Sequence, residues 1–173
     1  MSAQSGPYFE DIRVGEEYTS PGRTVTEADI VIFAGLSGDY NVLHTDAEHM
    51  KSSTFGERIA HGLLGLAIQH GLLGRVMPPA GAEQLGALKW KFKGPIKIGD
   101  TIHVLARVAA KKDGDKPEWG VVTIERRVLN QRGEVVQEGE TEHLLAKRGD
   151  GGVRGRHLLG GPDMAPDPPG PRR

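Results

Sequence analysis

The chain has 173 residues, enough for one domain with a sizeable core, and only 5% of them are aromatic, so the core should be aliphatic. The formal net charge of −1 argues against nucleic-acid binding, and the absence of cysteine excludes disulfides, thiolate metal sites and cysteine nucleophiles. No apolar run reaches membrane-spanning length, and the first residues lack the pattern of a signal peptide. We therefore expect a soluble cytoplasmic protein with neither a membrane nor a nucleic acid as its partner.

Two helices are predicted in the first third of the chain. Thr26 to Asp29 resembles a capping box, apolar residues follow at helical spacing, and Gly38 is a plausible stop. A second Thr-x-x-Glu start occurs at Thr45. The stretch from Asp39 to His44 should then be a non-helical connection, held at both ends and able to carry functional side chains.

A longer and more apolar helix is predicted over residues 61–74, HGLLGLAIQHGLLG. Apolar residues occur all round it, which is typical of a buried helix. The pentad HGLLG occurs twice, with its two histidines, His61 and His70, nine residues apart. Nine residues are two and a half helical turns, so these side chains should point in opposite directions, which argues against a shared metal site.

Residues 87–146 have the alternating pattern of strands. Period-two runs cover residues 87–92, 102–108, 122–128 and 135–146, and turn signals separate the last three of them. Helices followed by an antiparallel meander predict an α+β domain over residues 1–148. In residues 149–173, twelve of 25 positions are Gly or Pro, which predicts a disordered tail.

The chemistry of the chain is concentrated in Asp39, His44 and Gly62. Adding water to an α,β-unsaturated thioester requires a base for the water, an acid for the α-carbon and a donor for the enolate oxygen. Asp39 and His44 could hold one water between them, and the Gly62 amide at a helix start could face the oxygen. Each residue also has an ordinary explanation as a turn, pre-cap or packing residue. Spacing alone therefore leaves a hydratase as one candidate among several.

Other kinds of site are not supported by the sequence. The stretch from Asp39 begins like a calcium loop, but its sixth position is His44 and its twelfth is Met50. There is no Walker sequence, no dinucleotide fingerprint, no His-x-x-x-His pair and no Gly-x-Ser-x-Gly. We expect no metal and no cofactor.

Three motifs follow one another along the chain: YFEDIRVGEEY, then AGLSGDYNVLHTDAEHMKSSTFGERIAHGLL, then FKGPIKIGDTI. Together they resemble the MaoC-like dehydratases, a family that includes the R-specific enoyl-CoA hydratases. That family typically reads SGDxNPxHxD, followed by a stretch that ends in a His-Gly pair. The resemblance covers residues 8–146.

The resemblance implies a hotdog fold, in which an antiparallel sheet wraps around a long central helix, with a homodimer as the minimal unit. It implies reversible hydration of trans-2-enoyl-CoA to (R)-3-hydroxyacyl-CoA, so that the partner is an acyl-CoA thioester. Asp39 and His44 would form the catalytic pair, the Gly62 amide would contact the thioester carbonyl, and Asn41 would hold the loop in shape.

The sequence departs from the family pattern at two positions, the first of which loosens the loop slightly without affecting the catalytic pair and the second of which concerns the acyl pocket and so the substrate. Val42 replaces the usual proline, and His70 stands where R-specific hydratases tend to carry a small hydroxyl residue. Candidate substrate contacts are Asn41, His61, His70 and Lys93, the last of which, like Arg58, could meet a coenzyme A phosphate. Packing or surface roles are the alternative for each. The remaining histidines are interpreted as surface or edge residues: His49, His103, His143 and His157.

Two other functions stay open at this point. One is a thioesterase on the same fold, and the other is a non-catalytic subunit that binds acyl-CoA.

Overall fold

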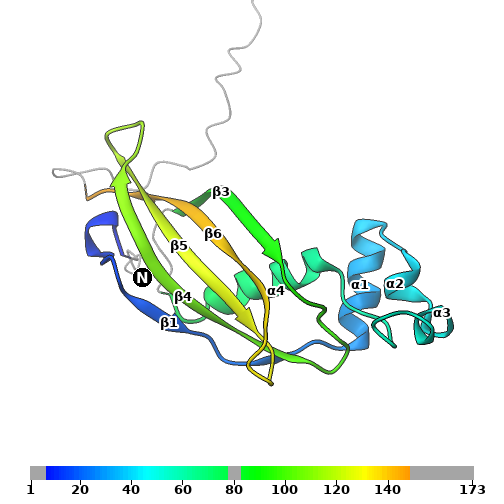
Figure 1. Cartoon of the computed structure of the whole chain (residues 1–173). Coiled ribbons are helices and arrows are strands. Elements are labelled where there is room, and N and C mark those ends of the chain that lie inside the picture. Colours follow the sequence, from blue (N-terminus) through cyan, green and yellow to red (C-terminus); the bar gives the residue numbers. More distant parts are fainter. Residues whose placement is uncertain (1–6, 78–82, 149–173) are drawn as a thin grey trace, which may run out of the picture.

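The computed structural model describes residues 7–77 and 83–148 (Figure 1). Its elements in chain order are η1 Phe9–Asp11, β1 Glu17–Thr19, β2 Arg23–Thr24, α1 Glu27–Ser37, α2 Val42–Thr45, α3 Ala47–Lys51, α4 Gly62–Leu73, β3 Glu83–Phe92, β4 Thr101–Asp113, β5 Trp119–Leu129 and β6 Val135–Ala146. The predicted tail, residues 149–173, lies outside the described residues. None of the described helices is long and apolar enough to cross a membrane.

The strands form one antiparallel sheet in the order β1-β4-β5-β6-β3, with β2 also pairing with β4. The predicted meander is confirmed for β4, β5 and β6, which pair in sequence order. It is wrong for β3, which pairs with β6 at the far edge rather than with β4. Periodicity identifies a strand but not its neighbour, because pairing is decided by contacts between distant parts of the chain.

The core lies between the sheet and α4, which runs along one face of it (Figure 1). Buried and exposed positions alternate along β4 and β5, as the period-two pattern predicts. The buried side chains are aliphatic, as expected from the composition, and include Val104, Val108, Ile124 and Leu72. A sheet wrapped around a central helix is the hotdog arrangement, so the predicted fold class is confirmed.

Helix α4 matches the predicted helix, but its burial is one-sided. Leu64 and Leu72 are buried, whereas the Leu63 side chain is 60% exposed. The expectation of burial all round is therefore wrong for one face. Where α4 approaches the sheet, a Cβ on Gly65 would collide with the Gln137 side chain and with Ile96. Glycine at this position allows the close approach, and Gln137 uses it to reach the helix backbone.

Helices α1 to α3 gather at one end of the sheet (Figure 1). The predicted capping box is confirmed, since Thr26 and Asp29 bond each other's backbone N–H groups, and Gly38 ends α1 with a φ of 75°. The second helix differs from the prediction. Asn41 caps a short helix α2 that contains His44, and Asp46 caps α3. The stretch from Asp39 to His44 is thus partly helical, because Asn41 supplies an N-cap that the capping-box pattern did not indicate.

Candidate active site

Asp39 lies in the turn between α1 and α2, and its position is set by short-range hydrogen bonds. The Asp39 N–H donates to Ser37 Oγ at 3.2 Å, and Asp39 Oδ1 accepts from the Asn41 N–H at 3.2 Å. The Asn41 Oδ1 in turn accepts from the Leu43 N–H at 3.0 Å, which caps α2. The Asp39 side chain stays 53% exposed, so its second carboxylate oxygen, Oδ2, is accessible to a small molecule.

His44 lies on α2 with only 10% of its side chain exposed. Its Nδ1 lies 2.8 Å from the carbonyl oxygen of Ile59. A carbonyl can only accept, so Nδ1 carries the hydrogen and, in the neutral ring, Nε2 keeps a free lone pair. That lone pair is on the side of Asp39.

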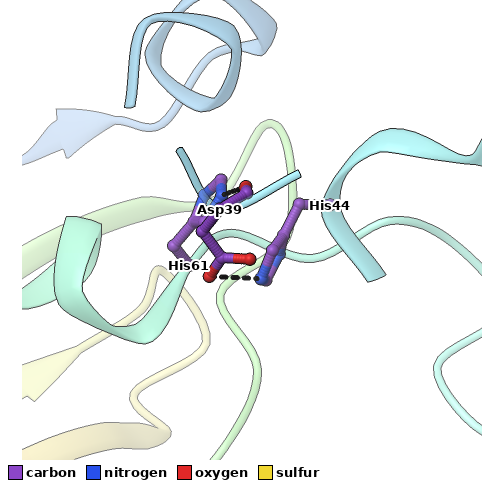
Figure 2. Close-up of side chains that lie close together, drawn as sticks. All are labelled: Asp39, His44 and His61. Atoms are coloured by element: carbon purple, nitrogen blue, oxygen red, sulfur yellow. Dashed lines mark hydrogen bonds and ion pairs between the residues drawn. The ribbon is translucent and has the colours of Figure 1, made fainter. Parts of the chain in front are cut away.

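The Asp39 carboxylate and the His44 ring face each other across a gap (Figure 2). His44 Nε2 and Asp39 Oδ2 are 3.9 Å apart, which is too long for a direct hydrogen bond. Both atoms are acceptors when the carboxylate is ionised and the ring is neutral. A water molecule that donates one hydrogen to each would satisfy both. This geometry can therefore polarise a single water from two sides.

Residues 59–61 are held against this pair by backbone contacts from two directions. The Ile59 N–H donates to the Leu43 carbonyl at 3.1 Å, and the Ala60 N–H donates to the Ile96 carbonyl at 2.8 Å. Arg58 adds a two-pronged ion pair with Glu27 of α1, at 2.8 and 2.6 Å. Hydrogen bonding to this carboxylate raises the pKa of Arg58, so its guanidinium already has a partner. The coenzyme A contact considered for Arg58 would have to compete with Glu27.

Gly62 is the first residue of α4, and His61 is its N-cap. Within the described residues, no hydrogen-bond acceptor faces the Gly62 N–H. The residue is exposed, and a Cβ at this position would lie 3.0 Å from the Phe92 ring. An unpaired amide at a helix N-terminus attracts negative charge through its hydrogen and through the helix dipole. It can thus stabilise an oxyanion.

Asp39, His44 and His61 offer ligand atoms that all lie within 4.8 Å of one another, a spacing at which a metal ion could be held. The two imidazole rings, however, are stacked, with centroids 3.7 Å apart and an interplanar angle of 27°. Ring nitrogens bind metals along the ring plane, so the lone pairs of stacked rings converge poorly on one tetrahedral ion. The geometry fits a water-activating pair better than a metal site.

The other predicted site residues are spread out. Asn41 caps α2, in agreement with its expected role in the loop. His61 is only 2% exposed and contacts Asp39 and His44 rather than the surface. His70 is exposed near the end of α4, about 12 Å along the helix from Gly62 at 1.5 Å per residue. Lys93 directly follows β3, and its Nζ lies 3.4 Å from a carboxylate oxygen of Glu138.

Sequence reasoning missed two hydrogen bonds that hold the backbone at Gly62 against the sheet. Gln137 Nε2 donates to the Gly62 carbonyl at 3.0 Å, and Trp90 Nε1 donates to Gln137 Oε1 at 3.1 Å. These contacts fasten the first turn of α4 to strands β6 and β3. The only sequence signal was the place of Gln137 in an alternating strand, which does not indicate its partner.

The interpretation of His143 as a surface or edge residue is wrong, because it belongs to a second group of buried polar side chains. His143 is only 2% exposed. Its Nε2 is 2.6 Å from Arg126 Nη2 and 2.9 Å from Thr141 Oγ1. Arg126 also donates to Gln69 Oε1 on α4 at 3.4 Å. A polar residue in a strand can face the core when its partners are supplied by neighbouring elements.

A groove of about 490 Å³ lies on the exposed face of the sheet, on the opposite side from α4. Its charged side chains alternate along the strands with the buried core positions. Both signs are present, as Lys89, Lys91, Arg107 and Arg127 lie among Glu125, Glu138 and Glu140. None of the candidate site residues lines it, and its charge suits solvent rather than an apolar chain.

Comparisons with known proteins show which family the chain belongs to. An (R)-specific enoyl-CoA hydratase from Rhodospirillum rubrum is 38% identical over 142 residues, which are 82% of this chain and 94% of that protein. An (R)-specific enoyl-CoA hydratase from Aeromonas caviae is 32% identical over 140 residues, covering 81% and 96%. The X-ray structure of a monoamine oxidase regulatory protein from Archaeoglobus has a TM-score of 0.79 and 38% identity, over 86% of this chain and 100% of that one. A family model described as a MaoC like domain matches residues 11–128, and the chain therefore belongs to the MaoC-like family.

Proposed function

We propose that this protein catalyses the reversible hydration of trans-2-enoyl-CoA to (R)-3-hydroxyacyl-CoA in the cytoplasm. The observation that carries the proposal is the 3.9 Å separation of Asp39 Oδ2 and His44 Nε2, with the His44 ring oriented by the Ile59 carbonyl. The two relatives that match over most of this chain and bear the name (R)-specific enoyl-CoA hydratase support the reaction and its stereochemistry.

In the proposed reaction, the pair moves one proton of the water to the substrate, and the other proton stays on the new hydroxyl group. One member of the pair takes the proton from the water as the water oxygen bonds to the β-carbon of the substrate. The same member then gives this proton to the α-carbon, while the other member holds the second hydrogen of the water. Both members end in their starting protonation states, so water is added in full and no cofactor or metal is required.

The Gly62 amide supplies the third requirement. When the β-carbon is attacked, negative charge develops on the thioester oxygen, and a donor aimed at that oxygen lowers the barrier. The Gly62 N–H has no acceptor among the described residues and lies next in sequence to a residue that contacts both members of the pair. The helix dipole adds to its effect.

The proposal includes a homodimer formed through β3. Within the described residues β3 pairs only with β6, so its other edge is open. Apolar side chains on and near this strand are half exposed, which is unusual for a monomer: Leu63, Leu85, Leu88 and Phe92. Because the Phe92 ring adjoins Gly62, a second subunit at this edge would border the site. Lys93 and His70 stay predicted substrate contacts; the Lys93 side chain pairs with Glu138, which lines the groove on the other face of the sheet.

The decisive experiment compares Asp39→Asn and His44→Ala with the unchanged protein on a panel of enoyl-CoA thioesters. Each substitution should lower turnover by about 10²–10⁴, the usual contribution of a general acid or base. Loss of the conjugated-enoyl absorbance measures the rate, and chiral analysis of the product tests the R configuration. Asp115→Asn and His49→Ala, which alter exposed side chains of the same types, are the matched controls.

Two results would count against the proposal. Release of free thiol without loss of the enoyl group would indicate a thioesterase. Tight binding of acyl-CoA with no turnover of any chain length would indicate a non-catalytic subunit. If either site variant hydrates enoyl-CoA at a near-normal rate, the proposed reaction stands, but Asp39 and His44 are not its catalytic pair.

A further inference from the structure

His61 is a buried histidine whose side chain does not cap the helix that it begins. It is the N-cap of α4, but its side chain accepts no hydrogen bond from the helix. It is 2% exposed, so a bound substrate would not meet its ring directly. Side chains at this position normally satisfy free N–H groups of the first turn. The imidazole must therefore have another use.

The contacts of His61 are with the two members of the water-holding pair (Figure 2). Its Nε2 lies 2.9 Å from the backbone carbonyl oxygen of Asp39, so Nε2–H donates there. Its ring stacks on His44 at 3.7 Å between centroids. On a second side it meets the Phe33 ring of α1, at 5.1 Å and 56°. One side chain thus contacts the backbone of one member and the ring of the other.

The second ring nitrogen of His61 is buried at a cost to stability. Because Nε2 carries the hydrogen, Nδ1 is an acceptor, and no partner for it is found among the described residues. A buried acceptor without a donor is unfavourable. A phenyl ring would fill the same space, keep both ring contacts and avoid that cost. Stability alone would therefore favour phenylalanine, and what only histidine adds is the hydrogen bond to Asp39.

We propose that His61 is a positioning residue, which acts through Asp39 and His44 to set the gap between them and their place relative to the Gly62 amide. The proposal rests on the proposed hydration and refines it. The bond to the Asp39 carbonyl fixes the turn that carries the carboxylate, while stacking holds one face of the His44 ring. Because Gly62 follows His61 directly, the same residue links the acid–base pair to the oxyanion donor.

Two substitutions separate the two contacts. His61→Phe keeps the stacking and removes the donor, whereas His61→Gln keeps a donor near the position of Nε2 and removes the ring. Both should lower kcat by about 10- to 100-fold while KM changes by less than about twofold, because misplacement of reacting groups affects the transition state more than binding. His49→Phe, the same exchange at an exposed position, should leave both constants unchanged. Circular dichroism and thermal melting confirm that the variants are folded.

A residue that acts through His44 should lose its effect when His44 is absent. We therefore expect His61→Gln, which removes the stacking on His44, to lower kcat much less in a His44→Ala background than in the unchanged protein. If the substitution lowers kcat by the same factor in both backgrounds, the role of His61 is purely structural and the inference is overturned. An unchanged kcat in both His61 variants of a protein that hydrates enoyl-CoA would overturn it as well.

A measurement without substrate keeps this test separate from the proposed function. Nitrogen-15 spectra of the His44 imidazole should report one tautomer with Nδ1–H in the unchanged protein and a mixture in His61→Gln. If the unchanged protein hydrates no enoyl-CoA, the proposed function fails while the spectra still decide the positioning role. Identical His44 spectra in all variants would refute that role.

Discussion

Replacing Gly62 with proline removes one hydrogen atom from the proposed oxyanion site at little cost to the fold. Gly62 is the first residue of α4, the position at which proline is best tolerated, because its N–H has no helical partner. The preceding residue must then be extended, and His61 already has φ −56° and ψ 135°. The ring would press on Phe92, which is 54% exposed and free to move.

The expected loss follows from the role of one donor. Removing a single oxyanion-hole donor costs about 10²–10³ in kcat, or about 2.7–4 kcal/mol. Stability should change little, since proline at a compatible position restricts the unfolded chain and contributes about 0.4–1 kcal/mol in favour of folding. Gly62→Ala is the matched control. It retains the N–H and adds only a Cβ against the Phe92 ring.

Steady-state hydration of one enoyl-CoA, together with urea unfolding of each variant, provides the test. We expect Gly62→Pro to be folded and slow, and Gly62→Ala to be folded and much faster than Gly62→Pro. A proline variant that turns over at the rate of the alanine variant would refute the assignment of the amide as the oxyanion donor. A proline variant that is unfolded in buffer would show that the first turn of α4 differs from the one described.

Two further predictions concern stability and assembly. Burial raises the pKa of Asp100, but hydrogen bonds from the Lys97 N–H, Gln131 and Arg132 outweigh this effect and leave the pKa below its usual value. The ionised carboxylate therefore stabilises the folded protein above about pH 4, and this stabilisation is lost as the pH falls through the folded-state pKa. Asp100→Asn should therefore lower the free energy of unfolding by about 1.5–3 kcal/mol at neutral pH. In urea titrations at different pH values, it should also flatten the fall in stability on the acid side. An unchanged fall on that side would contradict this prediction. Sedimentation should give twice the chain mass of 18.7 kDa, and Leu88→Lys on the open edge of β3 should shift the protein toward monomer. A stable monomer before any substitution would refute the proposed interface.

The sequence by itself determined the features that depend on neighbouring residues. The capping box at Thr26, the glycine stop at Gly38, the helix from residue 62 and the alternating strands are all present in the structure. Their signals are local, because helix caps and side-chain periodicity involve residues a few positions apart. The motif from Ser37 to His44 predicts Asp39 and His44 as a catalytic pair through its likeness to a known family, and the structure brings the two side chains within 3.9 Å of each other.

Only the tertiary structure decided which distant groups meet. The 3.9 Å gap depends on a carbonyl at Ile59, and the stacking of His61 on His44 depends on contacts of residues 59–61 with α2 and with Ile96. The pairing of β3 with β6 and the burial of His143 were mispredicted for the same reason. Partners far apart in sequence are brought together by the packing of α4 on the sheet, and no local pattern specifies which of them will touch.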